Sequence, residues 1–272
     1  ERTGRRPKDT PVYFYAQLSK PMDKVVSWRE GRIESNSNPE RISGKNAGMA
    51  VRFKTEKDEK VMLKVAISYV SVEQARKNML TELSGWDFEQ VKQSSFSEWN
   101  DWLGRIEVEG GSREQQIKLY TDLWHALLGR HVVSDADGHY MDMTSDFPRI
   151  RQIPLGEDGK PLYNHHNFDA WWGSHWSLNI LWSMAYPEVM DNFCNTMIDM
   201  YQNGGLIPRG PSGGNYTYVM IGDPAVSFFA SAYNKGIRNY DAELAYEGLR
   251  KNAFVGGIRD HAGYEHSKTA YS

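Results

Sequence analysis

The sequence predicts a mixed β plus α fold, in which an antiparallel portion of a β-sandwich precedes a closed double ring of paired helices. Residues 11–70 contain apolar segments that alternate or run continuously and are rich in β-branched and aromatic residues, which is typical of strands. From Ser112 onward, apolar residues recur at helical spacing. No repeat of fixed period is visible, which disfavours a helical repeat array and favours a closed ring.

We expect residues 1–72 to form the C-terminal part of the β-sandwich. The predicted strands are PVYFYAQLS at 11–19, GMAVRFKT at 48–55 and KVMLKVAISYV at 60–70. Segments rich in turn-forming residues separate them, namely NSNPE, SGKN and TEKDEK. The first strands of such a sandwich are expected upstream of residue 1.

Residues 73–110 are expected to form a helical linker. SVEQARKNMLTEL at 71–83 has a helical pattern, and a longer helix is predicted within SGWDFEQVKQSSFSEWNDWLGRI at 84–106. IEVEGG closes this connector, so we place the domain boundary near Gly110.

Residues 111–272 are expected to form the first part of the helical ring, with no strands between its helices. Ser112 and Gln115 have the spacing of a capping box, and Gly129 ends the first helix. The apolar face of this helix carries Ile117, Tyr120, Leu123, Trp124, Leu127 and Leu128. Asp137-Gly138 and Asp158-Gly159 mark turns in the loop that follows. Further helices are predicted at 169–185, at 187–204, from Asp223-Pro224 to about Lys235, and from Asp241.

Composition narrows the function classes. The chain has 32 basic and 35 acidic side chains with no basic block, so nucleic acid is not expected as a partner. No stretch approaches the roughly 18 apolar residues of a membrane span. The single cysteine, Cys194, excludes a disulfide scaffold and is expected to pack as a small hydrophobe. Because the chain starts ERTGRRPKDT without an initiator Met, we expect it to be a piece of a longer polypeptide, whose remainder is one of its partners.

The segment HHNFDAWWGSHW, residues 165–176, concentrates histidine and tryptophan. Its histidines lack the i, i+4 pairing of a metal-binding helix, so metal ligation is disfavoured. Its tryptophans either pack in the core or stack on a flat-faced ligand such as a sugar.

Two further segments carry polar candidates. GLIPRGPSGGNYT, at 205–217, is a loop rich in Gly and Pro, in which Arg209 either donates to a ligand hydroxyl or pairs with a surface carboxylate. Asn215 begins an N-glycosylation acceptor triplet. In MIGDPAV, Asp223 either caps a helix or holds a substrate, and the two roles are compatible.

Other acidic residues show no catalytic pattern. DADGHYMDM at 135–143 lacks the spacing of a calcium-binding EF-hand and is better explained by a hairpin turn. No nucleophile–base constellation is visible, and no pair of carboxylates is identified by spacing alone as the two that glycoside hydrolysis requires. We therefore assign no catalytic residue and no metal ligand within this sequence.

Taken together, the chain resembles family 92 of the glycoside hydrolases, the calcium-dependent exo-α-mannosidases. The segments that carry the resemblance are GKNAGMAVRF, VAISYVSVEQARKN, GWDF, LYTDLWHALLGRHVVSDADGHY, MYQNGGLIP, GNYTYVMIGDPAVS and NKGIRNYDAELAYEGLRKNA. It implies a β-sandwich followed by an (α/α)6 barrel with the pocket between them, and an inverting mechanism in which calcium helps to bind mannose.

The same resemblance places the catalytic carboxylates and most calcium ligands beyond Ser272. This chain would then carry part of the sugar pocket and bind mannose-containing glycans. Asp223 matches an aspartate that contacts the terminal sugar in the family. The expected substrate-binding residues are Asp223, Trp171, Trp172, Asp169, Arg209 and Asn215. Family members act on extracellular glycans, which implies a periplasmic or secreted location.

Two departures from the family pattern fall at the expected pocket. The family often has an acid directly after the Trp of the aromatic segment, whereas Trp171 is followed here by Trp172. The position after Gly222-Asp223 is often His in the family and is Pro224 here. Both put the family's usual α-1,2-mannoside preference in doubt. The alternative hypothesis is a non-catalytic carbohydrate-binding protein of the same architecture.

Overall fold

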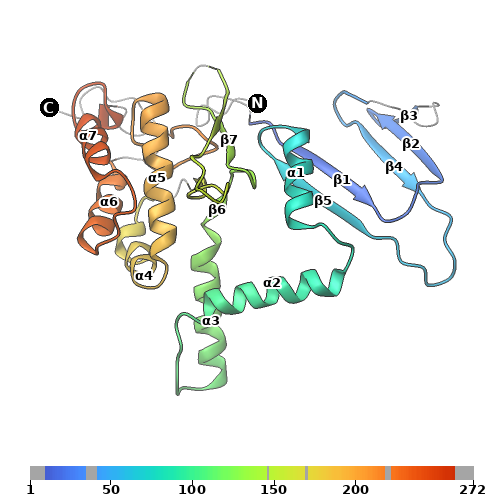
Figure 1. Cartoon of the computed structure of the whole chain (residues 1–272), viewed down its shortest axis with the longest axis horizontal. Helices are drawn as coiled ribbons and strands as arrows, with labels where there is room; N and C mark the ends of the chain where they lie inside the picture. The colour runs from blue at the N-terminus through green and yellow to red at the C-terminus, as the bar shows by residue number, and fades with distance from the viewer. Residues whose placement is uncertain (1–9, 35–41, 146, 169–170, 218–221, 261–272) are drawn as a thin grey trace.

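The structure is a computed structural model that describes residues 10–34, 42–145, 147–168, 171–217 and 222–260. Small antiparallel sheets come first in the chain and are followed by helices, interrupted by short strands (Figure 1). This confirms the predicted fold class, with the helical ring present in part. No helix among the described residues combines the length and apolarity needed to cross a membrane.

The sandwich portion contains two sheets. β1 (Tyr13–Leu18) pairs antiparallel with β5 (Leu63–Ser68), and β2 (Lys24–Arg29) lies between β3 (Arg32–Glu34) and β4 (Gly48–Arg52). The three predicted strands are confirmed as β1, β4 and β5, with shorter bounds. The β2–β3 hairpin was not predicted. Its turn residues Glu30 and Gly31 both have positive φ, but Glu is an unusual choice there, so the sequence lacks the usual Asn-Gly or Asp-Gly signal.

One face of the β1–β5 pair packs against α1 (Val72–Glu82), which begins at its N-cap Ser71. The opposite face remains apolar and open to solvent among the described residues. Phe14 and Ile67 face each other there in register and are 64% and 52% exposed. A strand pair with one covered and one open apolar face is what a β-sandwich with only part of its strands would show.

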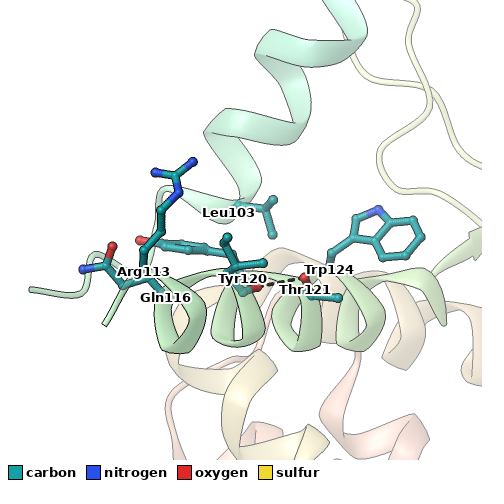
Figure 2. Close-up of a pocket in the computed structure, with 7 residues that line it drawn as sticks. Leu103, Arg113, Gln116, Tyr120, Thr121 and Trp124 are labelled. Carbon is teal, nitrogen blue, oxygen red and sulfur yellow. Dashed lines mark hydrogen bonds between the residues drawn. The ribbon is translucent and has the colours of Figure 1, made fainter. Parts of the chain in front are cut away.

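α2 (Phe88–Leu103) and α3 (Arg113–Leu128) lie in the lower part of the view in Figure 1. Their C-terminal halves pack against the helical core, where Trp102 stacks on Tyr186 and Leu127 is buried. The predicted capping box is confirmed, since Ser112 and Gln115 exchange both of its hydrogen bonds. Only part of the predicted apolar face of α3 is covered, because Leu123 and Leu127 are buried while Ile117 is 54% exposed. A groove of about 480 Å³ therefore lies between Leu103 of α2 and the ring of Tyr120 and neighbouring side chains of α3 (Figure 2).

The prediction that no strands separate the helices is wrong. Four short strands follow α3, and they form two antiparallel pairs, β6 with β9 and β7 with β8. Their bounds are β6 His131–Val132, β7 His139–Asp142, β8 Arg149–Gln152 and β9 His166–Asn167. These strands are two to four residues long and largely polar, so they lack the apolar alternation from which a strand is predicted. The predicted turns at Gly138 and Gly159 are confirmed, as both residues have positive φ.

The helix predicted at 169–185 begins later. Gly173 has φ +86°, and a 3-10 turn, Ser174–Trp176, separates it from α4 (Leu178–Ala185). A left-handed residue breaks an α-helix, so the apolar pattern of 171–176 belongs to an irregular segment. Residues 169 and 170 lie outside the described residues.

The last three described α-helices match the prediction closely. α5 (Pro187–Gly204) begins with proline and ends at Gly205, whose φ is +86°. α6 (Pro224–Asn234) and α7 (Ala242–Asn252) follow, and Asp241 caps α7 by accepting a hydrogen bond from the Leu244 amide. These helices pack together around a core centred on α5 that includes Trp171, Trp182, Phe193, Cys194 and Phe228. The expected packing of Cys194 as a small buried hydrophobe is confirmed.

Candidate functional site

Asp223 stands directly before α6, but its side chain makes no capping hydrogen bond. Oδ2 instead accepts a hydrogen bond from Asn252 Nδ2 at the end of α7, at 3.3 Å. Oδ1 is buried and has no hydrogen-bond partner among the described residues. Burial raises the pKa of this carboxyl, and the hydrogen bond from Asn252, the charges of Arg259 and Arg209 and the backbone amide of Ala225 oppose that rise. Asp223 therefore forms no capping hydrogen bond of normal geometry, although the Ala225 amide in the first turn of α6 still favours its ionised form. Oδ1 is left without a hydrogen-bond partner among the described residues.

Asn252 orients Asp223 and was not predicted from the sequence. Its Nδ2 also donates to the Ile207 carbonyl at 2.8 Å, so one buried amide joins the 205–217 loop, α7 and the start of α6. An asparagine in the last turn of a helix has no distinctive sequence pattern. Only the packing of α7 beside this loop reveals its role.

Arg209 is 1% exposed and lies near Asp223. Its Nε donates to the Gly222 carbonyl at 2.8 Å and its Nη2 to the Ile258 carbonyl at 2.7 Å. Both bonds end on backbone, in the residue before Asp223 and in the segment after α7. Arg209 thus holds the backbone around Asp223, and direct contact with a ligand stays a prediction.

Asn215 lies in a tight turn of the glycine-rich loop. Ser212 and Asn215 exchange backbone hydrogen bonds, and the Asn215 Oδ1 accepts from the amide of Tyr216. Gly214 approaches β7 so closely that a Cβ there would collide with the Met141 carbonyl. This turn therefore requires glycine and places Asn215 beside the short strands rather than in the cluster around Asp223 and Asn252.

The two adjacent tryptophans lie in opposite environments. Trp171 is fully buried and contacts the rings of Phe168, Phe193 and Phe228, whereas Trp172 is 66% exposed. Trp171 is thus a core residue, which matches one of the two roles expected from the sequence. The exposed ring of Trp172 is free to stack on a ligand. The third candidate from this segment, Asp169, lies outside the described residues.

A pocket of about 200 Å³ lies between the sandwich portion and the strands that follow α3. Thr10, Val12 and Tyr69 line it on the sandwich side. The helical portion contributes Val133, Met141, Asn167, Gly213 and Gly214. We call this space the interdomain pocket. Among the predicted residues, Asn215 is its nearest neighbour in sequence, immediately after Gly214.

Two histidines of the 165–176 segment are buried. His165 and His166 are almost fully buried, and burial lowers their pKa values to about 3 and about 4, so both rings are neutral. Among the described residues, no three His, Cys, Asp or Glu side chains gather closely enough to hold a metal ion. We therefore assign no calcium ligand among the described residues and derive no chemical step through calcium here. The acidic segment at 135–143 forms a turn, closed by the bond from the Gly138 amide to the Asp135 carbonyl, and then β7. The predicted hairpin turn is not within it, because β7 pairs with β8 and their connection follows Asp142.

Asp199 of α5 is a partly buried carboxyl that the sequence did not reveal. Tyr163 Oη lies 2.9 Å from both of its oxygens, and His165 Nε2 lies 3.8 Å from Oδ2. Burial raises the pKa of Asp199 from its usual 3.8 to about 7. The folded state therefore binds this proton more tightly than the unfolded state. The contribution of Asp199 to the free energy of unfolding falls as pH rises from about 4 to about 7, because the folded protein must then give up the proton.

For Asp199→Asn in the complete protein, we compare the free energy of unfolding of variant and parent. We expect the difference, variant minus parent, to be more favourable at about pH 8 than at about pH 4, by up to roughly 4 kcal/mol. The free energy of unfolding of parent and variant, measured across this range, checks the expectation. Comparison at each pH removes the opposing contribution of His166, which is common to both proteins. A difference that stays constant with pH would show that Asp199 does not titrate in this range.

Models of two protein families match the chain. The glycosyl hydrolase family 92 N-terminal domain matches residues 1–68, and the glycosyl hydrolase family 92 catalytic domain matches residues 74–271. A curated relative from Arthroderma benhamiae, described as an uncharacterized secreted glycosidase, is 26% identical over 214 residues, which cover 77% of this chain and 22% of the relative.

Solved structures agree with this assignment. A family 92 inverting mannosidase from Bacteroides thetaiotaomicron superposes with a TM-score of 0.76 at 22% identity. The matched region covers 93% of this chain and 33% of the mannosidase chain. A family 92 α-mannosidase from the same bacterium, solved in complex with mannoimidazole, superposes with a TM-score of 0.73 at 25% identity. The matched region covers 88% of this chain and 31% of that α-mannosidase chain. The chain thus spans no more than about a third of the length of these relatives. With the N-terminal and catalytic models matched in order along nearly all of its length, the chain belongs to glycosyl hydrolase family 92.

Proposed function

We propose that this chain contributes part of the sugar pocket of an exo-acting, inverting α-mannosidase that releases mannose from α-mannosides or glycans. The main support for this proposal is Asp223, which matches the family's sugar contact. Its buried Oδ1 has no hydrogen-bond partner among the described residues. A carboxylate oxygen buried without a donor is costly. The hydroxyl groups of a bound sugar would supply the missing donor.

The surrounding residues support this role. Asn252 fixes one oxygen of Asp223 and leaves the other available. Arg209 holds the carbonyl of Gly222, so the backbone next to Asp223 is anchored before any ligand arrives. The exposed ring of Trp172 offers an aromatic face on which a sugar could stack. A mannose-type ligand is supported by the family 92 α-mannosidase that was solved with mannoimidazole and is 25% identical to this chain.

Catalysis itself is proposed to require the remainder of the polypeptide. An inverting glycosidase needs one carboxylic acid and one carboxylate on opposite sides of the bond that breaks, and we assign neither to residues of this chain. Calcium, which would help to bind the mannose ring, is likewise proposed to be held by residues beyond Ser272. A secreted or periplasmic location is proposed because the Arthroderma relative is described as secreted.

The test is a time course of hydrolysis of an α-mannobiose by the complete protein, followed by proton NMR. We expect free mannose to appear first as the β-anomer, because inversion converts an α-linkage into a β-product. Removal of calcium with a chelator should abolish release, and added calcium should restore it. Mannose binding without release would favour the non-catalytic alternative, and an α-anomer as first product would exclude inversion.

A further inference from the structure

A buried polar network joins the sandwich portion to the helical portion. Asp135, in the turn before β7, is 5% exposed. Its carboxylate accepts hydrogen bonds from Ser68 Oγ at the end of β5, at 2.9 Å, and from Asn78 Nδ2 in α1, at 2.8 Å. Ser68 is the last residue matched by the N-terminal domain model, and Asp135 lies within the match to the catalytic domain. The Ser68 bond therefore crosses the boundary between the two domains.

Asn78 is the centre of this network. Its Nδ2 also donates to the Ile67 carbonyl in β5 at 2.9 Å, and its Oδ1 accepts from the Ala136 amide at 2.9 Å. A single buried amide thus bonds to the last strand of the sandwich and to the turn after Asp135. Because both of its polar atoms are used in a buried site, loss of the side chain leaves several groups without partners.

A second, outer layer lies beside it. Gln74 Nε2 is 3.1 and 3.2 Å from the two Asp137 oxygens, and Lys77 Nζ is 3.2 Å from one of them. Lys77 is largely exposed, so its ion pair contributes little to stability. Asn78 and Asp135 are the buried members of the network.

The network lies next to the interdomain pocket. Tyr69, on the sandwich wall, follows Ser68 directly, and Val133, on the opposite wall, is two residues before Asp135. Hydrogen bonds that hold Ser68 to Asp135 therefore also hold the two walls at a fixed separation. We infer that Asn78 and Asp135 form an interdomain clamp that positions the sandwich portion against the helical portion and sets the width of this pocket.

Hydrogen exchange followed by mass spectrometry tests the clamp in the complete protein without reference to activity. In Asn78→Ala we expect exchange to become at least about five-fold faster in residues 131–139, where the Ala136 amide loses its acceptor, and faster in residues 63–68. Exchange in α5, residues 187–204, should not change. Arg76→Ala, an exposed position on the same helix, is the matched control and should leave all of these segments unchanged.

Faster exchange confined to α1, or none, would overturn the clamp. If Asn78→Ala does not fold, Ser68→Ala keeps the Asn78 bonds and removes the bond to Asp135, together with the bonds that Ser68 Oγ accepts from the Val70 and Ser71 amides. It should produce a smaller increase in the same two segments. In a second assay, which rests on the proposed function, Asn78→Ala should raise KM for an α-mannoside several-fold with a smaller change in kcat, and an unchanged KM would overturn control of the pocket width. A parent protein that releases no mannose would refute the proposed function, and the exchange result would still decide the clamp.

Discussion

Asp223→Ala in the complete protein is expected to lower kcat/KM for mannose release by about 10- to 150-fold. This range corresponds to the loss of a hydrogen bond to a charged group, roughly 1.5–3 kcal/mol. The structure gives the physical reason, since Oδ1 of this carboxyl is buried, has no hydrogen-bond partner among the described residues and is not used to cap α6. Initial rates of mannose release, with substrate varied around KM, measure the effect.

Asp241→Ala is the matched control for this variant. Asp241 also stands directly before a helix, but its side chain does cap that helix through the Leu244 amide. Its removal should lower the free energy of unfolding by about 0.5–2 kcal/mol and leave turnover largely intact. Retention of full activity by a folded Asp223→Ala would refute the binding role of Asp223.

Trp171→Ala is expected to lower the free energy of unfolding of the helical portion by about 3–5 kcal/mol. The indole is completely buried, and its ring centroid lies 4.1 Å from that of Phe228 in α6 and 4.7 Å from that of Phe193 in α5. Its removal opens a cavity between these helices, which together bear the start of α6 and Asp223. Denaturant unfolding of the complete protein, followed by circular dichroism, measures the loss.

Trp172→Ala separates packing from ligand contact at the neighbouring position. Because Trp172 is largely exposed, its replacement should change the free energy of unfolding by no more than about 0.5 kcal/mol. If the two variants destabilise the protein equally, the core assignment of Trp171 is wrong. Lower affinity for a mannoside in Trp172→Ala, with stability unchanged, would identify this ring as the one that stacks on the sugar.

Features with local causes were predictable from the sequence. Ser112 with Gln115, Pro187 and Asp241 each begin a helix through chemistry contained within about one turn, and the structure confirms all three. β1 was predictable from its three aromatic residues, Tyr13, Phe14 and Tyr15, and β5 from its β-branched residues Val65 and Ile67. The resemblance to family 92, which rests on ordered segments along the chain, is likewise confirmed.

Features with distant causes were not predictable. The short strands after α3 are held by bonds to remote residues, such as the Val133 amide to the His165 carbonyl and the Met143 amide to the Gly214 carbonyl. Asp223 has every local mark of a cap, yet Asn252, 29 residues away, takes its bond. The network around Asn78 spans 57 residues to Asp135, and no local pattern announces it.

The measurement that tests the central claim most directly is the affinity of the complete protein for mannoimidazole, determined by calorimetry for the parent, Asp223→Ala and Asp241→Ala. If the start of α6 forms part of the sugar pocket, the dissociation constant should rise at least about ten-fold in Asp223→Ala and stay unchanged in Asp241→Ala. Equal affinity in all three proteins would contradict the account and place the sugar elsewhere.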